Sequence, residues 1–190
     1  EHNCDVGLIF DLPIFGNDTP EVKKRKQERT VENAALAIKH HEVKSLHLYG
    51  VMQGHTVEEQ KYMWSMYQPH LDNLQGMAIG GLVPIAGNFA KLIEVLGCFF
   101  ELTKDFKKPL HIFGLSGTSA ILIINYLSSL YDRKDVTYDS SSYGSGAIRR
   151  ELEHIWSGMT LNFGDKLSNK LKEIPFASPV SVAIKDIAEL

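Results

Sequence analysis

Polar residues that can do chemistry stand at the ends of several strand-like runs in this sequence. Asp11, Gln53 and Asp139 each follow a short apolar run, and Gly80-Gly81 follow another. Functional groups at the carboxyl ends of successive strands are typical of active sites in (β/α) barrels. The sequence therefore predicts one site that is assembled from several strand ends.

Asp11 and Asp139 are the carboxylates of this set. Two carboxylates that face one cavity suit retaining glycosyl transfer, in which one attacks the sugar and the other, about 5 Å away, moves a proton. The same two-step logic exchanges a base on a sugar through a covalent glycosyl intermediate. Each Asp also has a simpler interpretation, because Asp139 precedes the serines at 140–142 and Asp11 precedes Leu12-Pro13, where a carboxylate can cap a turn.

The other members of the set suit recognition of a planar ring. Gln53 offers both a donor and an acceptor, so it can bind the edge of a heterocycle or else stabilise a turn. Gly80 and Gly81 have no Cβ, which lets backbone approach a flat ligand closely. Gly114 lies in a loop before an apolar helix, whose amino terminus could attract phosphate. His55 is the histidine nearest this set, and we expect the others to be solvated or hydrogen-bonded within the fold.

Alternating strands and helices must position these residues. Asp18 with Glu21, and Thr56 with Glu59, have the spacing of capping boxes that begin helices. The near-continuously apolar strands between helices predict a parallel sheet. We expect strands at 6–10, 46–52, 77–82, 110–114 and 136–138, and helices at 18–41, 56–67, 88–103, 118–130 and 147–156.

Five strand–helix units are fewer than the eight of a closed barrel, which takes about 250 residues. The units could form a five-stranded doubly wound sheet, or the carboxyl-terminal part of a (β/α)8 TIM-type barrel. The strand-end residues favour the barrel, so we expect a partial barrel at 1–156 and a terminal segment at 157–190. The chain starts without Met and almost directly in a strand, which suggests a piece of a longer protein.

The composition is that of an ordinary globular protein, with 190 residues, 44% of them hydrophobic, and a net charge of −3. This charge gives no global basic field that would attract nucleic acid. Two cysteines provide neither a disulfide framework nor metal-ligand spacing, which fits a reducing cytoplasm. No apolar run reaches the roughly 18 residues that a membrane span needs.

Taken in order, the strand ends resemble the tRNA-guanine transglycosylase superfamily. Segment 49–54 (YGVMQG) is similar to the family's G-[IV]-[VI]-Q-G strand, and segment 78–82 (AIGGL) matches its A-I-G-G-L strand almost letter for letter. Tyr138-Asp139 falls where the family has its nucleophilic Asp. The resemblance implies that Asp139 is catalytic and that the base is held by Asp11, Gln53, Gly80, Gly81, Leu82 and Gly114.

In two features the sequence departs from the tRNA enzymes and resembles the DNA-modifying branch of this superfamily, which inserts 7-deazaguanine bases such as preQ0. Serines follow Asp139 where tRNA enzymes have Cys-Val-x-Pro-Thr-Arg. Segment 174–181 keeps the frame of the family's zinc element, but Phe176, Ser178 and Ser181 replace its cysteines, so we expect no structural zinc and no other cofactor. The resemblance implies base exchange in DNA, with Arg149 and Arg150 as nucleic-acid contacts and tRNA as the alternative substrate.

The family's second catalytic Asp, in a T-D-S-G-G-type motif, has no counterpart in this chain. The resemblance therefore leaves the general acid and base unassigned. It implies that an N-terminal part or a partner chain completes the barrel. A non-catalytic half-barrel subunit is the remaining alternative.

Overall fold

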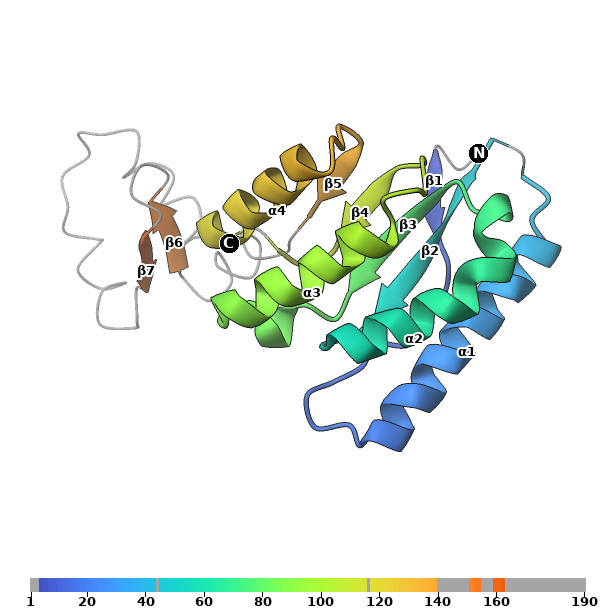
Figure 1. The fold of residues 1–190 in the computed structure, drawn as a ribbon, viewed down its shortest axis with the longest axis horizontal. Coiled ribbons are helices and arrows are strands. Elements are labelled where there is room, and N and C mark those ends of the chain that lie inside the picture. The colour runs from blue at the N-terminus through green and yellow to red at the C-terminus, as the bar shows by residue number, and fades with distance from the viewer. Residues whose placement is uncertain (1–3, 44, 116, 140–150, 155–158, 163–190) are drawn as a thin grey trace, which may run out of the picture. The chain divides into compact units, whose positions relative to one another are not determined.

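Parallel strands alternate with helices in the computed structural model, which describes residues 4–43, 45–115, 117–139, 151–154 and 159–162 (Figure 1). The chain divides into two compact units, Glu1–Asp139 and Ser140–Leu190, whereas the sequence analysis placed a boundary near 156. The first unit contains β1 (Val6–Leu8), α1 (Pro20–Lys39), β2 (His47–Gln53), α2 (Val57–Tyr67), β3 (Gly76–Gly80), α3 (Phe89–Leu102), β4 (Leu110–Ile112), α4 (Thr118–Leu130) and β5 (Val136–Tyr138). Two short 3-10 helices, Gln68–Asn73 and Val83–Ile85, precede and follow β3.

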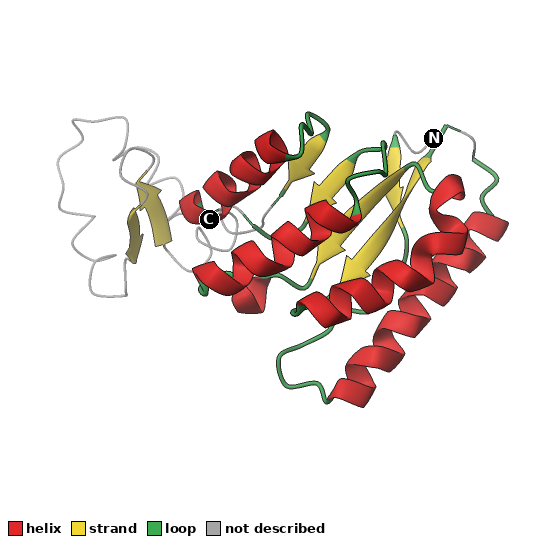
Figure 2. Cartoon of the chain, in the orientation of Figure 1, coloured by secondary structure: helices red, strands yellow, loops and turns green. Residues whose placement is uncertain are grey.

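The five strands of this unit lie in chain order, β1-β2-β3-β4-β5, and every neighbouring pair is parallel. A doubly wound sheet reverses its strand order and carries helices on both faces. Here each crossover adds a strand on the same side, and crossovers of one hand place their helices on one face. Figures 1 and 2 show α1, α2 and α3 side by side in front of the strands, with α4 beside α3. The sheet is therefore a curled half-barrel, and the expected alternation of strands and helices is confirmed.

The two faces of the sheet differ in chemistry because side chains alternate along each strand. On the helix side, the fully buried residues include Met52, Met77, Ile79, Leu110 and Ile112. The opposite face carries smaller and more polar residues in matched rows, namely Tyr49 with Gly76, Gln53 with Gly80, and His111 with Thr137. The core thus lies between the sheet and its helices, and the helix-free face presents the groups that can do chemistry.

Thr19, and not Asp18, caps the amino terminus of α1. The Thr19 hydroxyl accepts the N–H of Val22 at 3.4 Å. Asp18 instead accepts the N–H of Phe15 at 2.7 Å and pairs with Lys26 at 2.7 Å. The predicted capping box was therefore wrong by one residue, because the turn before the helix already uses the Asp18 carboxylate.

The second unit contains an antiparallel pair, β6 (Glu151–His154) and β7 (Met159–Asn162). The helix predicted at 147–156 is therefore wrong over residues 151–154, which form a strand. The prediction failed there because of contacts between strands. The four residues of β6 pair one for one with those of β7, and such pairing overrides local helix propensity. The rest of the predicted 147–156 segment lies outside the described residues.

β2 extends past the end of β1, and side chains from the helices replace the missing strand partner. The Tyr67 hydroxyl accepts the N–H of Val51 at 3.2 Å and donates to its carbonyl at 3.0 Å. Gln27 Nε2 donates to the carbonyl of Gln53 at 2.5 Å, and the N–H of Gln53 faces Met63 Sδ at 3.0 Å. These contacts satisfy buried backbone groups and fix the position of Gln53.

Candidate functional site

One register row crosses the carboxyl end of the sheet and joins several predicted site residues. Gln53 is the partner of Gly80, and the N–H of Phe113 bonds to Ile79 while the N–H of Asp139 bonds to Ile112. Gln53 and Asp139 therefore belong to one row, three strand spacings apart, about 14 Å along a flat sheet. Residues of one row point to the same face of a sheet, so both side chains lie on the helix-free side.

Asp11 lies in a segment that α1 holds on both sides. Asn33 donates to the carbonyl of the preceding residue at 2.9 Å, and Thr30 Oγ1 accepts the N–H of the following residue at 3.0 Å. The Asp11 carboxylate accepts a short hydrogen bond from Gln53 Nε2. The structure thus brings two predicted base-binding residues into direct contact.

The amide of Gln53 lies against both glycines at the end of β3. A Cβ on Gly80 would stand 2.5 Å from Gln53 Nε2, and one on Gly81 would stand 2.8 Å from Gln53 Oε1. Gly81 also has a φ of +75°, which favours glycine. In this structure the glycines make room for Gln53, so a planar ligand can approach them only beside or in place of this amide.

His55 adds a buried polar atom that the sequence analysis did not include in the site. Its Nε2 would be 3.4 Å from a Cβ on Gly81, and its backbone N–H donates to Glu59 Oε2 at 2.6 Å. Among the described residues, neither His55 Nε2 nor Gln53 Oε1 has a hydrogen-bond partner, although both are buried. Buried polar atoms without partners mark a place where a ligand can supply the missing bond.

Burial lowers the pKa of His55, and the positive charge of Lys23 lowers it further. The carboxylate of Glu59 and the backbone of Gly81 act in the opposite direction with smaller effect. His55 is therefore a neutral imidazole at pH 7, with one N–H donor and one acceptor nitrogen.

Leu82 and Gly114, also predicted to hold the base, are engaged within the fold. The Leu82 side chain is fully buried, and its carbonyl accepts the N–H of Ile85 at 3.0 Å. Gly114 has a φ of +75° and donates its N–H to Asp139 Oδ1 at 3.1 Å. Gly114 thus orients the predicted nucleophile.

Asp139 combines exposure with a fixed orientation. Its side chain is 59% exposed, yet one oxygen is held by Gly114 and the other lies 3.6 Å from His111 Nε2. The other ring nitrogen of His111 lies 2.8 Å from Thr137 Oγ1, and the ring packs edge-on against Phe113. His111 was not among the predicted site residues, although its place on the strand predicted at 110–114, three residues before the end, could have indicated it.

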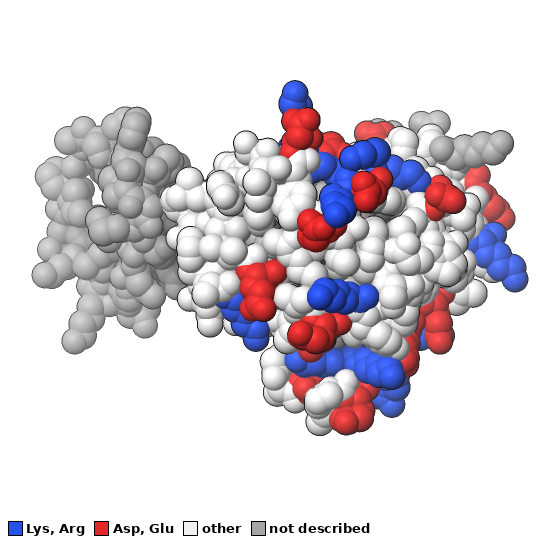
Figure 3. All heavy atoms as spheres, in the orientation of Figure 1, with Lys and Arg blue, Asp and Glu red and all other residues white. Residues whose placement is uncertain are grey.

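The remaining predicted residues lie outside the described part of the chain: Arg149, Arg150, Phe176, Ser178 and Ser181. Within residues 4–139, 151–154 and 159–162, apart from the gaps given above, no three His, Cys, Asp or Glu side chains are grouped as metal ligands. None of the described helices is both long and apolar enough to cross a membrane. Basic and acidic side chains are interspersed on the face shown in Figure 3.

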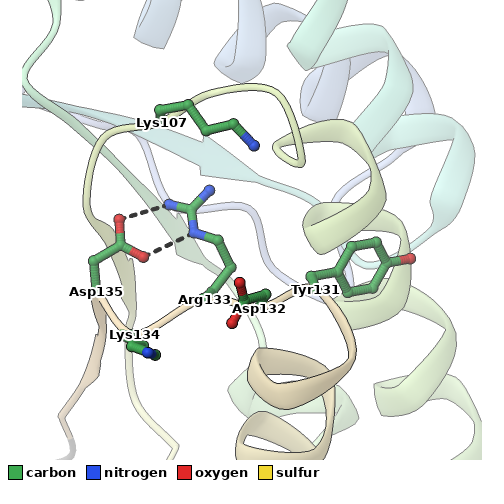
Figure 4. Close-up of a pocket in the computed structure, with 6 residues that line it drawn as sticks. All are labelled: Lys107, Tyr131, Asp132, Arg133, Lys134 and Asp135. Atoms are coloured by element: carbon green, nitrogen blue, oxygen red, sulfur yellow. Dashed lines mark hydrogen bonds and ion pairs between the residues drawn. The ribbon is translucent and has the colours of Figure 1, made fainter.

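A shallow cavity of about 370 Å³ lies at the opposite end of the sheet, where α4 leads into β5 (Figure 4). Lys107 and residues 131–135 line it. Arg133 is committed to structure there, since it pairs with Asp135 through two nitrogens and donates to the carbonyls of Thr103, Phe106 and Lys108. The amino-terminal end of a parallel sheet commonly serves stability, and this cavity contains none of the predicted site residues.

The candidate site is therefore the carboxyl edge of the half-barrel, with Asp11, Gln53 and His55 at one end and Asp139 with His111 at the other. Compared with protein-family models and with curated proteins, the chain matches none of them.

Proposed function

We propose that this chain carries the base-exchange site of a transglycosylase that acts on DNA. An Asp139 carboxylate oxygen bonds to C1′ of a deoxyguanosine, and the C1′–N bond to guanine breaks. A 7-deazaguanine base such as preQ0 then attacks C1′ and releases Asp139. The observation that carries this proposal is the shared carboxyl edge of five consecutive strands, which holds an oriented, exposed carboxylate and a separate set of ring-binding groups.

Asp139 meets the physical needs of a nucleophile. The N–H of Gly114 fixes one carboxylate oxygen, while more than half of the side chain stays accessible to substrate. A covalent glycosyl intermediate needs such a carboxylate on one face of the sugar. The Asp139 carboxylate accepts its hydrogen bond from across the sheet, from the loop that follows β4.

Asp11 and Gln53 supply the complement of a guanine-like edge. The carboxylate accepts N–H groups, and the amide both donates and accepts. In this structure they bind each other, so an incoming base replaces Gln53 Nε2 as the donor to Asp11. The unpartnered Gln53 Oε1 provides one further acceptor for the base.

A nucleic-acid substrate requires contacts beyond these residues. The serines after Asp139 and the replaced zinc cysteines favour DNA over tRNA, and a duplex base must be flipped out to reach the edge. Arg149 and Arg150 are the proposed phosphate contacts. We further propose that the half-barrel is part of a TIM-type (β/α)8 barrel in the cytoplasm, completed by an N-terminal part or a partner chain.

The test is to incubate the native protein, with any chain that copurifies, with guanine-containing DNA and to look for a covalent adduct by intact-mass measurement. We expect an adduct that disappears in Asp139→Asn and persists in Asp132→Asn, a control at the other end of the sheet. An adduct that survives in Asp139→Asn rejects the assignment of the nucleophile. Exchange of labelled guanine into tRNA, but not into DNA, would reassign the substrate.

A second candidate function is that of a non-catalytic half-barrel subunit. The open, five-stranded sheet favours it, since the described strands leave β1 and β5 as free edges. Native mass spectrometry of the complex, combined with the adduct assay, separates the two. A second chain in a complex that forms its adduct elsewhere supports the subunit role.

A further inference from the structure

We propose that His111 is the general acid and base of this site, with its proton carried on Nε2. This inference rests on the proposed transglycosylase function. That function needs a proton for the departing base, and no residue assigned above supplies one. His111 lies on β4, on the helix-free face, beside the residue proposed as nucleophile.

Thr137 fixes the tautomer of His111. The Thr137 hydroxyl has one hydrogen, which it donates to the carbonyl of Leu110 at 3.3 Å. Its oxygen is then free to accept at the 2.8 Å contact with His111 Nδ1, and we assign the Nδ1 hydrogen on this basis. Thr137 is thus a positioning residue that leaves Nε2 as the nitrogen able to gain and lose a proton.

Nε2 points toward the reacting carboxylate. It lies 3.6 Å from Asp139 Oδ2, while Asp139 Oδ1 is held by the N–H of Gly114. A bare Nε2 and a carboxylate oxygen repel each other, whereas an imidazolium beside a carboxylate is attractive. The geometry therefore suits a proton that is held on Nε2 beside the Asp139 carboxylate.

The surroundings leave this proton available for transfer. The ring edge of Phe113 covers one side of the imidazole, with ring centroids 4.7 Å apart. Thr137 occupies Nδ1, and Asp139 is the one carboxylate of the described residues within 4.0 Å of the ring nitrogens. The imidazole side chain is 19% exposed, so part of the ring is accessible to a substrate.

The proton balances in both half-reactions. As Asp139 bonds to C1′ and the C1′–N bond breaks, the electron pair stays on the leaving guanine, which takes the proton from His111 Nε2. The incoming base then attacks C1′ through its ring nitrogen, loses its N–H proton to Nε2, and displaces Asp139. One proton thus shuttles between base and imidazole, and the site returns to its starting state.

The test compares two DNA substrates, one with guanine and one with N7-methylguanine, which already carries a positive charge and leaves without added protonation. In His111→Gln we expect adduct formation on guanine DNA to slow by about 10²- to 10⁴-fold, the usual range for a general acid. Adduct formation on N7-methylguanine DNA should stay at the wild-type rate. His47→Gln, at the opposite end of β2, should match the wild type on both substrates.

Equal loss on both substrates in His111→Gln would overturn the acid role and leave the proposed function standing. A wild-type protein that forms an adduct with neither substrate would reject the transglycosylase function together with this inference. Nitrogen-15 NMR of the wild type checks the tautomer without any variant that could misfold. A bare Nδ1 on His111 would contradict the arrangement set by Thr137.

Discussion

The side-chain amide of Gln53 occupies the space that a Cβ atom on Gly80 would need, with Nε2 only 2.5 Å from that position. The two residues are register partners on β2 and β3, so the contact is set by the sheet itself. Gly81 continues the same surface, and its left-handed backbone presents no side chain to the amide. The two glycines and the amide therefore form one unit.

Replacing Gly81 by Ala tests this unit. The added Cβ meets Gln53 Oε1 at 2.8 Å and forces a side chain into φ +75°, so we expect a loss of about 1–3 kcal/mol in the free energy of unfolding. The matched control is Gly97→Ala, which adds a methyl in open space within α3 and should stabilise by about 0.5–1 kcal/mol. Urea denaturation measures both, and equal stability of the two variants would contradict the close packing at Gly81.

Arg133 should be a stability residue with no part in base exchange. Its removal in Arg133→Ala leaves the carbonyls of Thr103 and Phe106 without their donor, and we expect a loss of about 2–4 kcal/mol in the free energy of unfolding. Lys134→Ala, next to it, should change stability by less than about 0.5 kcal/mol. Thermal and urea unfolding check both. An Arg133→Ala protein as stable as wild type would show that the guanidinium contacts contribute little.

His55 should make the protein more sensitive to acid. Burial lowers its pKa below the ordinary 6.5, so the unfolded chain binds more protons than the folded one as the pH falls through 6.5. Stability therefore decreases with falling pH in that window. His55→Gln lacks this pH-dependent contribution to stability. The urea midpoints of the variant at pH 5 and pH 7.5 should therefore differ less than those of the wild type. The same pH dependence in both proteins would contradict the buried, neutral imidazole.

The two cysteines should differ in reactivity. Cys4 is exposed, whereas Cys98 is half-buried on α3, and burial raises the pKa of its thiol. The reactive species is the thiolate, so a disulfide reagent at pH 8 should modify Cys4 first and Cys98 slowly. Cys4→Ser should remove the fast phase and Cys98→Ser the slow one. A single phase with both thiols reacting together would be inconsistent with the packing around Cys98.

Local sequence signals were sufficient to predict which polar residues stand at strand ends. Gln53 and Asp139 follow apolar runs, and carboxyl ends of parallel strands share one edge, so their place at a common edge could be anticipated. The contact between His111 and Asp139 could not, because it depends on the register between two strands. The helix expected at 147–156 was wrong over residues 151–154 for a similar reason, since β6 forms by pairing with a segment farther along the chain.

The hydroxyl of Tyr67 has a wider consequence for the chain around Asp11. By taking up both backbone groups of Val51, it acts as a one-residue surrogate for a neighbouring strand. The connection between β1 and α1 therefore does not need to pair with β2 as a strand, and it can cross the ends of the strands. A longer or shorter connection would therefore change the shape of the binding edge while the architecture of the sheet stays intact.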